Sequence, residues 1–162
     1  MSQSYVFKFT VNLNTKIPEQ DMVTIKYLFG DCAIKPDSFP DHTFFSNSAE
    51  ISPFRFSYEN SLKGSYIFDF WGDKDKSKSR YSMNLYIPSL KLEEIYEYYL
   101  PFISWLSTFG LSSGYAGSFS LESAEDFDPM LLFVFKNSIY LGDTHSAFSF
   151  LSGEKISFKE LN

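Results

Sequence analysis

Apolar and polar residues alternate one by one over residues 4–13, near the start of the chain. A period of two places alternate side chains on opposite faces of a β-strand, so one face of this segment is apolar and the other polar. The pattern predicts a half-buried strand. Its core face would carry Tyr5, Phe7, Phe9, Val11 and Leu13.

The pattern changes to a helical period over residues 17–30. Pro18 suits the first turn of a helix, the acidic residues that follow suit the positive end of the helix dipole, and Gly30 is a natural stop. We therefore expect a helix here. Its buried stripe would contain Met22, Ile25, Leu28 and Phe29.

Residues 31–50 follow no period and are rich in Pro, Asp, Ser and Asn. They predict a long surface loop, and loops of this length are typical of binding or of disorder. Phe39, Phe44 and Phe45 favour an ordered loop, because three rings would pin it to the body of the domain.

Three segments then return to a period of two, at residues 53–58, 66–71 and 81–87. The polar stretch Gly72–Ser79 between the second and the third is typical of a hairpin tip. Together these segments predict a three-stranded antiparallel meander.

A long amphipathic helix is predicted over Ser89–Gly110, with Ser89 as its N-terminal cap and Gly110 as a left-handed residue after its end. Pro101 lies inside it, where a proline removes one backbone donor and clashes with the preceding turn at a cost of roughly 3 kcal/mol. The apolar stripe nevertheless continues through the proline. We therefore expect a kinked helix, or two short helices meeting near Leu100, over one face of the core. The stripe contains Leu92, Ile95, Tyr96, Tyr99, Phe102, Ile103, Leu106 and Phe109.

Strand patterns resume after this helix. Residues 114–122 alternate, residues 130–135 are apolar on both faces and predict a central strand, and residues 139–141 predict a short closing strand. A last hairpin is plausible in the tail after residue 143. The whole pattern predicts a single α+β domain over residues 1–162. We expect a mainly antiparallel, twisted sheet of about six to seven strands packed by two helices, in the order β-α-β-β-β-α-β-β-β.

Charge and composition narrow the classes of partner. The net charge of −6 and the pI near 4.9 argue against a nucleic-acid backbone or an anionic membrane as partner. The same acidity suits a basic protein partner, and it equally suits charge that serves only solubility. Aromatic residues make up 20% of the chain, so rings that do not fit into one small core remain for a binding surface.

The sequence also carries no sign of export or membrane insertion. Residues 1–9 lack the basic region and apolar core of a signal peptide, and no apolar run approaches the ~20 residues of a membrane helix. Cys32 is the only cysteine, which excludes an intrachain disulfide and a cysteine-based zinc cluster. We expect a cytoplasmic protein.

No pattern of catalytic or metal-binding residues stands out. His42 and His145 are the only histidines, too few and too far apart for a recognisable metal site. Cys32, Asp41 and His42 resemble a cysteine-hydrolase triad only weakly, since three common residue types in one loop carry little information. Residues 73–77 look like the start of an EF-hand loop but lack its glycine and closing glutamate. We expect no catalytic residue, no metal and no cofactor, and hence no enzyme.

One acidic segment is nevertheless a candidate binding site. Four carboxylates surround one phenylalanine within residues 122–128, between two predicted strands. Such a segment is commonly a solvated loop. Alternatively it is a recognition loop, in which the carboxylates meet Lys or Arg of a partner and the ring is the anchor. The candidate partner-binding residues are Glu122, Glu125, Asp126, Phe127 and Asp128.

The order of elements, the helix ending in KYLFGD and, above all, the segment SGYAGSFSLESAEDFDPMLLFVFKNSIYLGD at residues 113–143 resemble small stand-alone bacterial immunity proteins. These proteins neutralise toxins of contact-dependent inhibition and related polymorphic toxin systems. The resemblance implies a cognate-specific protein inhibitor that occludes a toxin's active site, and the family has no catalytic residues to carry over. The alternatives are a small-molecule-binding or enzyme domain with an aromatic-lined pocket, and a structural or oligomeric role.

Overall fold

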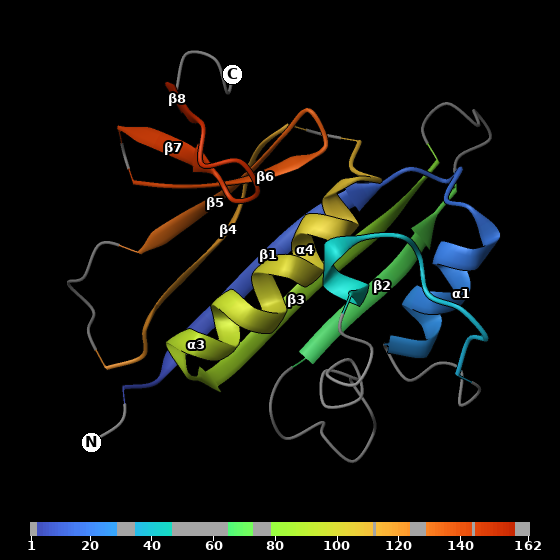
Figure 1. Ribbon diagram of the computed structural model, residues 1–162, viewed down its shortest axis with the longest axis horizontal. Coiled ribbons are helices and arrows are strands. Elements are labelled where there is room, and N and C mark those ends of the chain that lie inside the picture. Colours follow the sequence, from blue (N-terminus) through green and yellow to red (C-terminus); the bar gives the residue numbers. More distant parts are fainter. Residues whose placement is uncertain are drawn as a thin grey trace.

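The computed structural model describes residues 3–28, 35–46, 65–72, 79–111, 113–123, 129–143 and 145–157. Over these ranges the chain forms one antiparallel sheet and the helices that pack on it (Figure 1). The predicted strand at residues 53–58 and most of the predicted hairpin tip, residues 73–78, lie outside the described residues.

The described sheet has eight strands in the spatial order β2-β3-β1-β4-β5-β6-β7-β8. All neighbouring strands are antiparallel, which confirms the predicted α+β class. The tail forms the last hairpin, and its two strands bring the described total to eight. The strands are β1 Tyr5–Leu13, β2 Ser65–Trp71, β3 Arg80–Leu90, β4 Gly114–Leu121, β5 Met130–Phe135, β6 Ser138–Gly142, β7 Ser146–Ser149 and β8 Lys155–Ser157.

Among the first four strands, β1 and β3 form the inner pair and β2 and β4 lie outside them. β1 lies between β3 and β4, and β3 lies between β1 and β2. The connection from β1 to β2 carries a helix past β3, and the connection from β3 to β4 carries a helix past β1. This is the interlocked β-α-β-β-α-β order of a ferredoxin-like sheet, extended beyond β4 by the meander β5–β8.

In the described residues between β1 and β2 there are two helical segments. Helix α1 spans Glu19–Leu28, and η1 is a short 3-10 helix over Thr43–Phe45. The helix predicted over residues 17–30 is confirmed in its described part, since Ile25 and Leu28 are fully buried. Two of the rings predicted to pin the long loop are buried as well, in η1.

The long helical segment runs from Leu92 to Ser107 and lies across β1 and β3 in Figure 1. It consists of α3 (Leu92–Glu94), the π-helical turn η4 (Ile95–Tyr99) and α4 (Leu100–Ser107). The π turn ends where the sequence predicts a break: the Leu100 N–H donates to the Ile95 carbonyl, five residues back. Widening the helix one residue before Pro101 relieves the crowding that the proline ring causes in a regular turn.

Both ends of this helix differ from the prediction. Ser89 is not its cap: it lies in β3 with a left-handed φ of 59°, at an irregularity in the β1–β3 register. The cap is Lys91, whose N–H donates to the Glu94 carboxylate over 2.8 Å. At the other end Gly110 is not left-handed; it forms an isolated β-bridge with Leu13. The chain therefore leaves the helix directly into sheet pairing.

The main core lies between the sheet and the helices. The core face predicted for β1 is confirmed, because Phe7, Phe9, Val11 and Leu13 are at most 3% exposed. They join one cluster with buried residues of α1, α4 and β3. Rings from η1 and α4 complete it, with the centroids of Phe45 and Trp105 only 4.8 Å apart.

Strand β5 is apolar on both faces, as predicted. Leu132 and Val134 belong to the main core. Phe133 belongs to a second, smaller cluster with Ala147 of β7. The meander β5–β8 therefore has a hydrophobic centre of its own and does not rely on the helices alone.

Candidate functional site

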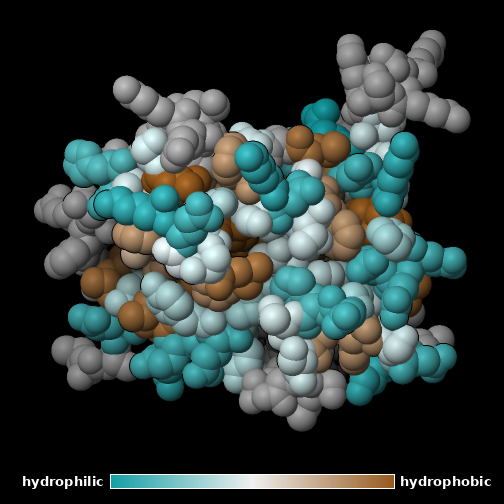
Figure 2. Space-filling model, turned by 45° about the horizontal axis from the view of Figure 1, so that its top comes forward, coloured by the Kyte–Doolittle hydropathy of each residue, from teal (hydrophilic) through white to brown (hydrophobic). Residues whose placement is uncertain are grey.

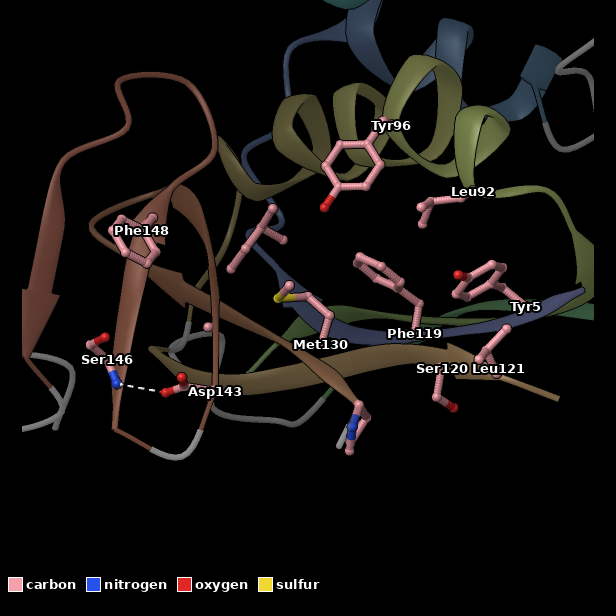
Figure 3. A pocket seen from close by; sticks show the side chains of 13 residues that line it. Tyr5, Leu92, Tyr96, Phe119, Ser120, Leu121, Met130, Asp143, Ser146 and Phe148 are labelled. Carbon is pink, nitrogen blue, oxygen red and sulfur yellow. Dashed lines mark hydrogen bonds between the residues drawn. The ribbon is translucent and has the colours of Figure 1, made fainter. Parts of the chain in front are cut away.

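An apolar groove of about 640 Å³ lies between the start of the long helical segment and the strands β4–β7. Leu92 and Tyr96 reach into it from the helix, towards Phe119 and Met130 on the strands, and Phe148 closes it from the side (Figure 3). We call this opening, lined by Leu92, Tyr96, Phe119, Met130 and Phe148 with their neighbours, the groove.

Strand register brings the residues of the groove together. Phe119 pairs with Met130 across β4 and β5, and Leu141 pairs with Phe148 across β6 and β7. Tyr96 meets the floor in an edge-to-face contact, with its ring centroid 6.0 Å from that of Phe119. The groove is therefore built from regular elements with fixed neighbours, which makes its shape a property of the fold.

Four of the large apolar side chains in the groove remain substantially exposed. The exposed fractions are 38% for Leu92, 41% for Tyr96, 36% for Met130 and 48% for Phe148. Single exposed hydrophobic residues are ordinary, but several that converge on one concavity mark a contact surface. On the face drawn in Figure 2, hydrophobic side chains reach the surface in several areas between hydrophilic ones.

The groove has one charged side chain among its lining residues, Asp143. The Asp143 carboxylate accepts hydrogen bonds from the backbone N–H groups of His145, at 2.7 Å, and Ser146, at 3.1 Å (Figure 3). These bonds, the one from His145 first, lower the pKa of Asp143 below its ordinary value. The ionised Asp143 carboxylate therefore stabilises the β6–β7 turn through these hydrogen bonds. Its lowered pKa makes it a poor general base near neutral pH.

The predicted acidic site is only partly described. Glu125, Asp126, Phe127 and Asp128 lie outside the described residues, within 124–128. Glu122 is described and exposed. Its carboxylate accepts a hydrogen bond of 2.8 Å from the backbone N–H of Ser89, and its own N–H donates to the Ser4 carbonyl. Glu122 thus ties the end of β4 to the left-handed turn in β3.

The acidic segment nevertheless begins and ends beside the groove, because Leu121 and Pro129 both line it. The charge of the surrounding chain is one-sided. Residues 92–135 contain seven carboxylates and neither Lys nor Arg, whereas the rest of the chain carries 13 carboxylates and 14 basic residues. Four of the seven carboxylates, Glu93, Glu94, Glu97 and Glu122, are in described residues, and none of these four lines the groove. A basic residue does approach it: Nζ of Lys155 lies 5.8 Å from the centroid of the Phe148 ring.

His42 does not line the groove, and His145 adjoins it only through its backbone N–H, which donates to the Asp143 carboxylate. The Nδ1 atom of His42 accepts the Phe44 N–H over 3.1 Å and caps η1, and burial lowers the pKa of His42. His145 lies in the β6–β7 turn. Within the described ranges, His, Cys, Asp and Glu form no group of three that would suit a metal ion.

Sequence reasoning placed Leu92 and Tyr96 in a buried stripe and did not identify a groove. A signal was present, since the stripe contains eight residues and Met130 and Phe148 add apolar side chains on two predicted strands. The sequence pattern does not give the position of the long helical segment relative to the strands β5–β8.

Among the described helices none is long and apolar enough to cross a bilayer. No protein-family model matches the chain, and comparisons with curated proteins and with solved structures found no match.

Proposed function

We propose that this chain is a non-enzymatic protein-binding module. The observation that carries this proposal is the convergence of four half-exposed apolar side chains, from helix and strands, on one groove. Together they leave on the order of 300 Å² in contact with water, given the 150–250 Å² that such large side chains bury. Covering that area contributes roughly 8 kcal/mol before the costs of association are subtracted.

The partner in this proposal is the cognate toxin of a bacterial contact-dependent inhibition or related polymorphic toxin system, met in the cytoplasm. Two observations support it: the resemblance of residues 113–143 to immunity proteins, and the net charge of −6, which complements a basic protein surface. The chain would act by covering the active site of the toxin and needs no catalytic group of its own.

The test is association of the purified chain with the protein encoded directly upstream of its gene. Isothermal titration calorimetry is expected to show saturable one-to-one binding that weakens as salt screens the charges. The toxin's activity is expected to fall in step with occupancy. A purified pair that does not associate at micromolar concentrations refutes the proposal.

A second candidate function is supported by the size of the groove. Its volume of about 640 Å³ falls within the range of small-molecule sites, and rings from Tyr96, Phe119 and Phe148 suit an aromatic or aliphatic ligand. A metabolite screen by thermal shift distinguishes the two: a small-molecule site predicts a ligand that raises the melting temperature without any protein partner.

A further inference from the structure

We propose that the π turn η4 positions one wall of the groove, and that Pro101 holds this turn in place. One extra residue in the turn rotates the start of the helix, so that Leu92 and Tyr96 face the groove and not the core. This rests on the proposed binding function of the groove and specifies what gives the groove its shape. Pro101 does not line the groove, so it acts as a positioning residue.

The rotation is visible in the exposure of the side chains along the helix. In an unbroken α-helix each residue adds about 100°, so residues seven and eleven positions before a buried residue lie on the same side as that residue. Tyr96 and Leu92 stand at these positions before the fully buried Ile103, yet they are 41% and 38% exposed. Ile95 stands eight positions before Ile103 and should lie to one side, yet it is fully buried. The first turns therefore face the core through a different residue from the one that α-helical spacing selects.

The π turn accounts for this difference. The Leu100 N–H donates to the Ile95 carbonyl, five residues back, where an α-helix would use the carbonyl four residues back. The turn thus contains one residue more than an α-helical turn, and the residues before it are shifted by one position, roughly 100° about the helix axis. Ile95 takes the place in the core that α-helical spacing gives to Tyr96.

The same rotation supplies the helical wall of the groove. Tyr96, turned out of the core, contacts Phe119 edge-to-face with the ring centroids 6.0 Å apart, and Leu92 lines the groove one turn earlier (Figure 3). With α-helical spacing throughout, both side chains would point into the core and Ile95 would turn away from it. The groove would then lose both of the helix side chains that line it.

Pro101 favours the π turn over an α-helical one. In a regular helix the proline ring clashes with the carbonyl four residues before it, which here belongs to Glu97. Glu97 lies inside the π turn, where the wider path of the backbone relieves that crowding. After Pro101 the chain continues as a regular α-helix to Ser107. Replacing the proline with alanine therefore removes the reason for the extra residue and allows the helix to close with α-helical spacing.

Single cysteines report which way the start of the helix faces. In a Cys32→Ser background, either Leu92→Cys or Ile95→Cys provides the only thiol, and its rate of reaction with an aromatic disulfide reagent is measured. With Pro101 present, the thiol at position 92 is expected to react rapidly and the thiol at position 95 slowly, as the parent exposures of 38% and 0% imply. With Pro101→Ala the order is expected to reverse, each rate changing about tenfold or more. A general loss of stability would accelerate both thiols, so a slower reaction at position 92 is specific to the rotation.

A compensating deletion separates the position of the side chains from the stability of the helix. Deleting the exposed residue Glu97 from the Pro101→Ala variant removes the extra residue, so a regular α-helix again places Ile95 seven positions before Ile103. This variant is expected to recover the parental thiol rates. Pro18→Ala is the matched control, since Pro18 precedes α1 and does not line the groove, and it is expected to leave both rates unchanged.

The inference is overturned if Pro101→Ala leaves both thiol rates unchanged or raises both, or if the deletion does not restore them. The affinity for the upstream protein, measured without the cysteine reporters, is expected to fall about tenfold in Pro101→Ala and to recover with the deletion. An unchanged affinity despite reversed thiol rates would also overturn the inference, since the partner would then not use the rotated side chains. An upstream protein that does not bind the parent refutes only the proposed partner, because the thiol rates are measured without it.

Discussion

Ser104 offers a sharp test of how the long helix packs. Its side chain lies in α4 between Ile103 and Trp105 and is 1% exposed. Within the described part of the chain its hydroxyl oxygen has no hydrogen-bond partner. A buried hydroxyl without a partner costs about 1–3 kcal/mol, and alanine is also the better helix former by about 0.5 kcal/mol.

Ser104→Ala is therefore expected to stabilise the fold. The small void left by the oxygen offsets part of the gain, so we expect a net increase of roughly 1 kcal/mol in the free energy of unfolding. Urea unfolding followed by circular dichroism measures it. With a slope of about 2 kcal/mol per molar urea, the midpoint should rise by roughly 0.5 M at unchanged slope.

Ser107→Ala is the matched control in the same helix. Ser107 is equally buried, but its hydroxyl donates to the Ser104 carbonyl over 2.8 Å and lies 3.4 Å from the Asn137 carbonyl. Removing it is expected to destabilise the fold by about 1 kcal/mol. If the two substitutions destabilise the protein by similar amounts, the Ser104 hydroxyl is paired in solution and the reasoning is wrong.

Three further predictions concern titration and packing. Because burial lowers the pKa of His42, its stabilising contribution should be complete above about pH 6.5 and decline as the pH falls below it. Urea unfolding should show that His42→Asn, which can still accept the Phe44 N–H, loses this part of the pH dependence; an unchanged profile would exclude His42 as its source. Burial raises the pKa of Tyr99 to about 12, so absorbance at alkaline pH should show a phenol that ionises near pH 12, and Tyr99→Phe should abolish that step. A Cβ atom at Gly117 would lie 2.0 Å from the Lys8 carbonyl oxygen, so Gly117→Ala should force β1 and β4 apart and lower the free energy of unfolding by about 2 kcal/mol or more; a variant as stable as the parent in urea would contradict this close approach.

The sequence was informative wherever one segment determines its own structure. Alternation alone identifies the buried face of β1, because a period of two needs no knowledge of what packs against it. The same holds for the break before Pro101, whose missing donor disturbs any helix, although local rules do not distinguish a kink from the π turn observed.

Features that depend on distant segments were not predictable in this way. Helical spacing places Leu92 and Tyr96 on the core side, but it does not reveal that both side chains line a groove and stay half-exposed. Glu122 illustrates the same limit. Its carboxylate accepts a hydrogen bond from Ser89, 33 residues away. Ser89 has a left-handed backbone conformation that the composition of the sequence does not predict. The groove likewise depends on contacts between segments that are far apart in the sequence.

The central place of β1 also dictates the order in which the chain acquires structure during synthesis. β1 precedes both of its neighbours in the chain, and Tyr5 pairs with Leu90 on one side and Leu121 on the other. Its row of apolar side chains therefore stays uncovered until most of the chain exists. Sequence-distant pairing of this kind slows folding and lengthens the time in which apolar surface is open to aggregation.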